Sequence, residues 1–138
     1  MAVIEAISTT RLEADAALIE FTSIPQTYEH LQLRISVRDV TASDSIEMGI
    51  RLGTGGGAVD TGSNYYGDRM AGYKTTLVGG AGGARAYLKY VAQFASGADV
   101  PSAQYGAGVV DILDYASATK MTTVIGFGGT AVGDSYPW

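Results

Sequence analysis

Two carboxylates close together in the sequence are the first candidates for chemistry. Asp111 and Asp114 lie three residues apart. If both lay on one strand, an odd spacing would put their side chains on opposite faces, where they could not share a proton. Asp114 is instead expected to open a turn, where an Asp side chain accepts backbone N–H groups. The spacing therefore does not favour an acid/base pair.

A second group of oxygen ligands lies in one polar stretch. Asp60, Asn64 and Asp68 could hold calcium, but they lack the alternating ligands and closing Glu of a calcium-binding loop. The single histidine, His30, has no Ser or Asp partner at a motif spacing and is expected at a turn or strand edge. We predict no metal site and no cofactor, with calcium in the polar stretch as the alternative.

Glycine clusters suggest phosphate binding at first sight. Gly53–Gly57 and Gly79–Gly83 each hold four glycines, but neither ends in the Gly-Lys-Ser/Thr of a phosphate-binding loop. Neither precedes a helix whose N-terminus could hold a phosphate. The chain also has no cysteine and no Gly-x-Ser-x-Gly motif around a nucleophile. We therefore expect loops between strands and no enzyme activity.

Composition narrows the class of protein further. The 138 residues are 46% hydrophobic and 17% charged, which fits a single folded domain over residues 1–138. A net charge of −5 argues against nucleic acid as a partner. No apolar run is long enough to span a membrane, and the first residues lack the pattern of a secretory signal. We expect neither nucleic acid nor a membrane among the partners.

Alternating hydrophobicity predicts the elements that must carry these residues. A period of two is typical of a strand with one buried face, and it is clearest at Leu31–Val37 and Ile46–Leu52, which we expect to be antiparallel neighbours. Further strands are predicted from apolar, β-branched or alternating sequence at Ala17–Thr22, Thr75–Val78, Arg85–Phe94, Gly108–Leu113 and Met121–Phe127. A helix over Leu12–Glu20 is the alternative to the first of these.

The segments between these strands are expected to be loops. Gly53–Gly67 is predicted as one long loop, and Gly79–Gly83 as a turn or flexible tip. Ser96–Ser102 is predicted as a loop and Gly128–Trp138 as a tail. With about seven short strands and no crossover helix, the sequence predicts an all-β fold, an antiparallel sandwich or barrel.

Aromatic residues in polar segments are the candidates for contact with other subunits. Tyr65 and Tyr66 lie in the predicted long loop, and Tyr136 and Trp138 lie at the end of the sequence. Exposed Tyr and Trp are favoured at interfaces, because the ring buries area while its polar tip stays hydrated. The alternative is that these loop aromatics pack back onto the sheet of their own chain.

Three stretches together resemble a known group of proteins. They are IEFTSIPQTYEHLQLRISVR (Ile19–Arg38), DTGSNYYGDRMAG (Asp60–Gly72) and YGAGVVDILDYASATKMTTV (Tyr105–Val124). In this order they resemble small virion structural proteins of tailed bacteriophages, common in phages of cyanobacteria and marine bacteria. The resemblance covers most of the chain. It implies a jelly-roll-like β-sandwich and a structural role on the particle.

The resemblance implies a leading function and an alternative. The leading one is a capsid decoration or cement protein, a homo-oligomer, expected to be a trimer, that binds the major capsid protein or another virion protein. It would be assembled in the host bacterial cytoplasm and located in the virion. The alternative is a tail fibre or tail-associated module that binds a host surface receptor or glycan through Tyr65, Tyr66 and Asp68. Members of the group usually continue beyond the tryptophan, so we expect an unpaired sheet edge that a neighbouring chain covers.

Overall fold

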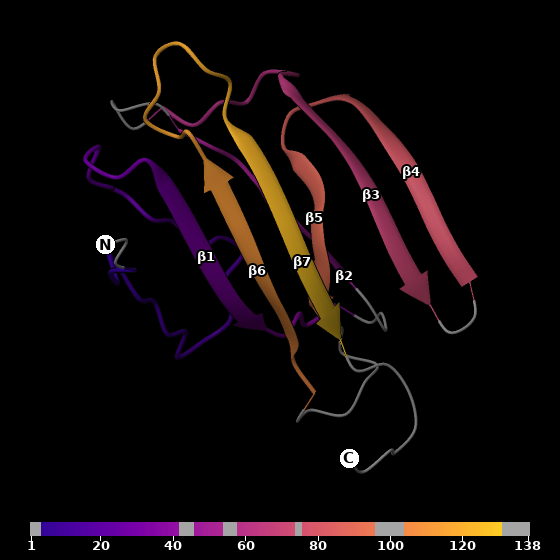
Figure 1. The fold of residues 1–138 in the computed structure, drawn as a ribbon. Helices are drawn as coiled ribbons and strands as arrows, with labels where there is room; N and C mark the ends of the chain where they lie inside the picture. Colours follow the sequence, from indigo (N-terminus) through magenta and orange to yellow (C-terminus); the bar gives the residue numbers. More distant parts are fainter. Residues whose placement is uncertain (1–3, 42–45, 54–57, 74–75, 96–103, 131–138) are drawn as a thin grey trace.

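The computed structural model describes residues 4–41, 46–53, 58–73, 76–95 and 104–130. In these residues the fold is all-β, without a helix, and all paired strands are antiparallel (Figure 1). The strands are β1 (His30–Val37), β2 (Ile46–Ile50), β3 (Tyr65–Tyr73), β4 (Thr76–Arg85), β5 (Leu88–Ala95), β6 (Gly106–Leu113) and β7 (Thr123–Thr130). They form three sheets, in the orders β1-β6-β7, β2-β5 and β3-β4. The predicted all-β, antiparallel class is confirmed.

The sheet β1-β6-β7 holds the centre of the core. Its register places Leu33 of β1 opposite Val110 of β6, which lies opposite Gly126 of β7. Because facing residues share a face, the even positions of β6 point inward, and Val110 and Ile112 are buried. The alternate residues of β1, from Leu31 to Val37, are half-buried on the same inner face. The period of two in the sequence therefore identified the inner face correctly.

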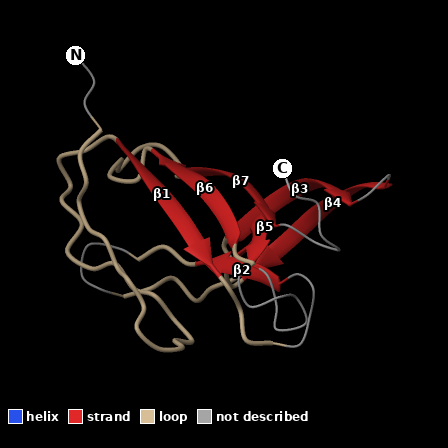
Figure 2. Ribbon diagram, turned by 90° about the horizontal axis from the view of Figure 1, so that it is seen from below, coloured by secondary structure: helices blue, strands red, loops and turns tan. Residues whose placement is uncertain are grey.

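β5 lies against the inner face of this sheet. It contacts β7 and β6 and, at its other side, approaches β3 (Figures 1 and 2). Two of the four inner positions of β7 opposite β6 are glycines, Gly126 and Gly128. A strand glycine leaves room for another backbone to come close. Glycine at these positions is compatible with the contact between β7 and β5, and β5 in turn pairs with β2.

β3 and β4 form a ribbon at the side of the fold. Pairing runs from Tyr73 opposite Thr76 to Tyr65 opposite Arg85, with a register shift between Tyr65 and Gly67. Figure 2 shows this ribbon extending away from β1 and β6. At Gly82 a Cβ would lie 2.5 Å from the carbonyl oxygen of Gly67, so the two strands approach each other as only glycine allows. The predicted turn at Gly79–Gly83 is wrong, because these residues lie within β4.

The segment before β1 contains neither strand nor helix from residue 4 to residue 29. The predicted strand at Ala17–Thr22 is therefore wrong, and so is the alternative helix at Leu12–Glu20. Among the apolar residues of this stretch, Ile19 and Phe21 are half-buried while Leu18 is exposed. Ile19 and Phe21 are thus partly covered although the backbone of this segment pairs with no strand.

Three further expectations are corrected by the strands and their pairing. β1 and β2 were expected to be neighbours, but β1 pairs with β6 and β2 with β5. The long loop predicted over Gly53–Gly67 is shorter, because β3 begins at Tyr65 and a bridge joins Gly53 to Val59. Gly128–Thr130, expected in the tail, belongs to β7. The predicted loop at Ser96–Ser102 lies outside the described residues.

In the part of the chain that the structure describes, no helix is long and apolar enough to cross a membrane.

Candidate functional site

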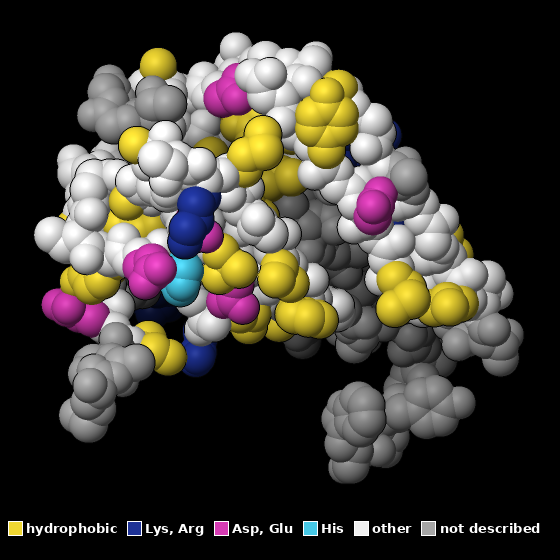
Figure 3. Space-filling model, turned by 45° about the horizontal axis from the view of Figure 1, so that its top comes forward, with side chains coloured by type: hydrophobic (Ala, Val, Ile, Leu, Met, Phe, Trp, Pro, Cys, Tyr) yellow, Lys and Arg dark blue, Asp and Glu magenta, His cyan; other side chains and the backbone are white. Residues whose placement is uncertain are grey.

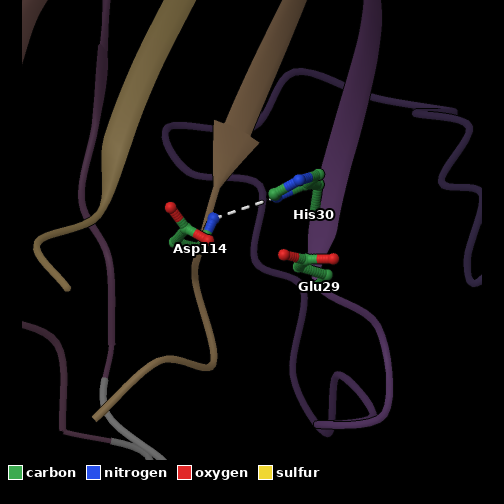
Figure 4. Close-up of side chains that lie close together, drawn as sticks. All are labelled: Glu29, His30 and Asp114. Atoms are coloured by element: carbon green, nitrogen blue, oxygen red, sulfur yellow. Dashed lines mark hydrogen bonds between the residues drawn. The ribbon is translucent and has the colours of Figure 1, made fainter. Parts of the chain in front are cut away.

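One group of titratable side chains is brought together where β1 begins and β6 ends. Glu29, His30 and Asp114 each place a possible ligand atom within 4.8 Å of the others (Figure 4). His30 is opposite Leu113 in the register, so its ring lies beside the residue that follows β6. The backbone N–H of Asp114 donates to His30 Nδ1 at 3.1 Å. The cluster thus joins residues that are distant in the sequence and that sequence reasoning did not connect.

The hydrogen bonds of this cluster do not suit a metal ion. Because Nδ1 accepts the Asp114 N–H, the proton of a neutral His30 ring belongs on Nε2. A metal needs a lone pair on a ring nitrogen, so binding would break the bond to Asp114 or remove the Nε2 proton. One oxygen of Asp114 is also occupied, since Lys120 Nζ lies 3.0 Å from Oδ1. The cluster fastens the turn after β6 to the start of β1.

The same turn shows a resolved electrostatic effect. The hydrogen bond to Asp114 and the charge of its carboxylate raise the pKa of Lys120. Asp114 has a positive φ of 55°, which Asp tolerates better than most residues, and its carbonyl accepts the N–H of Ser117 at 3.0 Å. Asp114 therefore opens a turn, as predicted. Its carboxylate pairs with Lys120, whereas backbone N–H groups were the expected donors.

A second constellation is built around Tyr65. Its hydroxyl accepts the N–H of Leu52 at 2.9 Å and lies 3.2 Å from the carbonyl oxygens of Leu52 and Asp60. The side chain is only 8% exposed. The N–H of Asp60 in turn donates to the carbonyl of Leu52 at 2.9 Å. Tyr65 therefore closes the loop between β2 and β3 from inside, as the packing alternative for the loop aromatics describes.

The oxygens proposed for calcium are arranged differently. Asp60 Oδ1 accepts the N–H of Gly62 at 2.8 Å, and Asn64 Nδ2 lies 3.1 Å from Oδ1 and 3.0 Å from Oδ2. Asn64 thus offers Asp60 a donor, whereas a shared cation would need its oxygen there. Asp68 lies on the exposed face of β3. This arrangement supports a self-bonded loop rather than a calcium site.

Large apolar side chains on regular strands are exposed to solvent. On the outer face of β3, Tyr66 is 69% and Met70 79% exposed, and Leu77 of β4 is 71% exposed on the same face of the ribbon. On β7, Phe127 is 71% exposed. Figure 3 shows hydrophobic side chains spread over the visible surface, with acidic and basic side chains between them. A contiguous exposed apolar patch is typical of a contact surface, and Tyr66, Met70 and Leu77 share one face of the ribbon.

The predicted contact residues have different positions. Tyr66 is exposed, and its contact with a partner stays a prediction, whereas Tyr65 is turned inward. Tyr136 and Trp138 lie outside the described residues. Sequence reasoning missed Met70, Leu77 and Phe127. No signal for Met70 was available, because the strand on which it shares a face with Tyr66 was not predicted from the sequence.

Three comparisons with known proteins found no match. The chain matches no protein-family model, and searches of curated proteins and of solved structures find no similar protein.

Proposed function

We propose that this chain is a structural protein of a bacteriophage virion, a capsid decoration or cement protein that binds the head shell. It would act by docking to other subunits and have no chemistry of its own. The virion setting is supported by the resemblance of the three sequence stretches given above. Its partners would be further copies of the chain, as a trimer at three-fold sites, and the major capsid protein or another virion protein.

The observation that carries a docking role is the exposure of Met70, Leu77 and Phe127 on regular strands. The backbone of a strand is already ordered, so when a partner covers an apolar side chain on it only the freedom of that side chain is lost. The side chains of Tyr65, Val110 and Ile112 are buried hydrophobic ones. The exposed apolar side chains on the strands support stabilisation by neighbours.

A sandwich of the jelly-roll type is part of the same proposal. The sheet β1-β6-β7 would form one layer, and β2-β5, which contacts it through β5, would belong to the other. The β3-β4 ribbon would extend the second layer where β3 approaches β5. Subunits of this shape can pack side by side on a shell while their exposed faces contact the capsid.

Copy number tests the proposal most cheaply. A decoration protein should be present in hundreds of copies and should purify with DNA-filled heads. Quantitative mass spectrometry of separated heads and tails would measure this directly. A handful of copies found with the tails would reject the decoration role, and absence from both would reject the virion proposal.

A tail module that binds a host receptor or glycan is the second candidate. One observation favours it: Tyr66 and Asp68 lie two residues apart on β3 and are both exposed on its outer face. An aromatic ring beside a carboxylate can stack on a sugar and accept its hydroxyl groups. Tyr66→Ala should then abolish binding to host cells while the protein stays in the particle.

A further inference from the structure

The free edge of β4 has little protection against association. β4 pairs with β3 at one side, and none of the described strands pairs with its other side (Figure 1). From Thr76 to Ala84 the strand reads TLVGGAGGA and carries no charged residue. An open edge presents unpaired N–H and C=O groups, which proteins usually guard with charges, proline or bulges. Here the register shift and Arg85 come only at the far end.

Two glycines of this edge, Gly80 and Gly83, could carry a side chain without meeting another part of the chain. A Cβ at Gly80 or Gly83 would meet no atom within 4 Å, and neither residue has a left-handed backbone. Gly82 differs, because its Cβ would strike Gly67. Glycine inside a strand is destabilising relative to alanine, so an unneeded one calls for an explanation. Close approach of a backbone from outside the chain supplies it.

We propose that β4 pairs with β4 of a second copy of this chain, antiparallel about a two-fold axis at Gly80. The strand has its large residues, Leu77 and Val78, in one half and Gly82 and Gly83 in the other. Pairing centred on Gly80 sets Leu77 opposite Gly83 of the second copy, and Val78 opposite Gly82. Each large side chain thus meets a position without one. The strand is complementary in shape to itself.

Charge does not oppose the pairing of two copies at this edge. The chain carries a net charge of −5, so two copies repel each other over most approaches. Self-pairing over Thr76–Ala84 places no like charges opposite each other. At the opposite end of the fold, β1 is also an edge strand but carries Arg34 near its middle. The contact would turn an exposed two-stranded ribbon into a four-stranded sheet, which is far more stable in water than a ribbon alone.

This contact concerns the association on which the proposed function rests, yet it is tested on the purified chain alone. A two-fold contact makes dimers, and a trimer would need a further surface. A chain that dimerises through β4 but is absent from virions would leave the contact standing and reject the virion proposal. A chain found in heads that does not dimerise through β4 would do the reverse.

The absence of cysteine makes a single-thiol test clean. In Gly80→Cys the two thiols would lie directly opposite each other, with Cβ atoms about 4.5–5.5 Å apart, close to disulfide range. Under mild oxidation at micromolar protein, a non-reducing gel should show a covalent dimer. Gly72→Cys is the matched control, on β3 of the same ribbon, exposed and equally open. We expect Gly80→Cys to cross-link at least about tenfold faster, because paired thiols have a high effective concentration.

A second variant keeps the test decisive if the disulfide geometry is unfavourable. Gly80→Lys places two like charges at the axis and should convert dimers to monomers by light scattering, with an unchanged circular dichroism spectrum. Gly72→Lys should leave the dimer intact. Equal cross-linking of the two cysteine variants, together with equal masses of the two lysine variants, would overturn the proposal.

Discussion

At the scale of single residues, Tyr65 is the position where the structure changes the interpretation most. A tyrosine in a polar stretch of sequence was expected to contact another subunit. In the structure its hydroxyl instead hydrogen-bonds to the backbone of Leu52 and Asp60. Its neighbour Tyr66 points outward from the same strand. The difference follows from the alternation of a strand, so it became predictable only once β3 was known to begin at Tyr65.

Removing the Tyr65 hydroxyl should therefore destabilise the fold. Tyr65→Phe leaves the N–H of Leu52 without its acceptor in a part-buried place, which costs about 1–3 kcal/mol of unfolding free energy. Urea unfolding followed by fluorescence would measure it. Tyr66→Phe, on the exposed ring, is the matched control and should change the midpoint little. Equal unfolding midpoints for both variants would contradict a stabilising role of the Tyr65 hydroxyl.

Asp39 gives a prediction for pH. Hydrogen bonds from the side chain and the backbone N–H of Thr41 lower the pKa of Asp39, with the N–H 2.5 Å from Oδ1. Because the folded pKa lies below the unfolded one of about 3.9, the stabilisation is complete above that value. It disappears as pH falls through the lowered folded pKa.

The measurement compares unfolding free energies of the protein and of Asp39→Ala at several pH values. The protein should be the more stable of the two near neutral pH, and the difference should shrink in acid. Asp39→Asn keeps an acceptor for Thr41 but does not titrate there, so its difference from Asp39→Ala should not change with pH. If the difference in unfolding free energy between the protein and Asp39→Ala grows in acid, the folded pKa of Asp39 is not lowered and the prediction is wrong.

At the scale of elements, sequence patterns found most strands but not their partners. The alternation of Leu31–Val37 and the β-branched run of Gly108–Leu113 identified β1 and β6. A strand with one buried face has apolar residues at alternate positions, and this pattern can be seen in the sequence. β4 was cut short at Val78, since glycines have no side chain with which to show a face. Pairing of β1 with β6 joins residues such as His30 and Leu113 that no local pattern relates. For the same reason the His30–Asp114 cluster could not be predicted.

Two glycines of the β3-β4 ribbon give opposite expectations for alanine. In Gly82→Ala the added methyl would lie 2.5 Å from the Gly67 carbonyl oxygen, so the strands must separate, at a loss of about 1–3 kcal/mol. In Gly72→Ala the methyl meets no atom within 4 Å, and the smaller entropy of the unfolded chain should stabilise by about 0.4–1 kcal/mol. Thermal unfolding of both variants tests this. Stabilisation by Gly82→Ala would show that the approach of β3 to β4 is not required.

At the scale of the whole molecule, stability and association should separate. Val110 is fully buried at the centre of β6, so Val110→Ala should lower the unfolding free energy by about 2 kcal/mol. Phe127 is 71% exposed, so Phe127→Ser should change it by less than about 0.5 kcal/mol. Pull-down with purified heads should weaken for Phe127→Ser. If Phe127→Ser unfolds the protein instead, the ring belongs to the core of its own chain.

The molecule is an antiparallel β body with exposed apolar side chains on its strands, and we propose that other subunits cover them. Sedimentation velocity of the unmodified full chain over a micromolar concentration series tests that claim most directly. We predict that the weight-average mass exceeds that of the 14.3 kDa chain and rises with concentration. A single species of monomer mass throughout the series would contradict it.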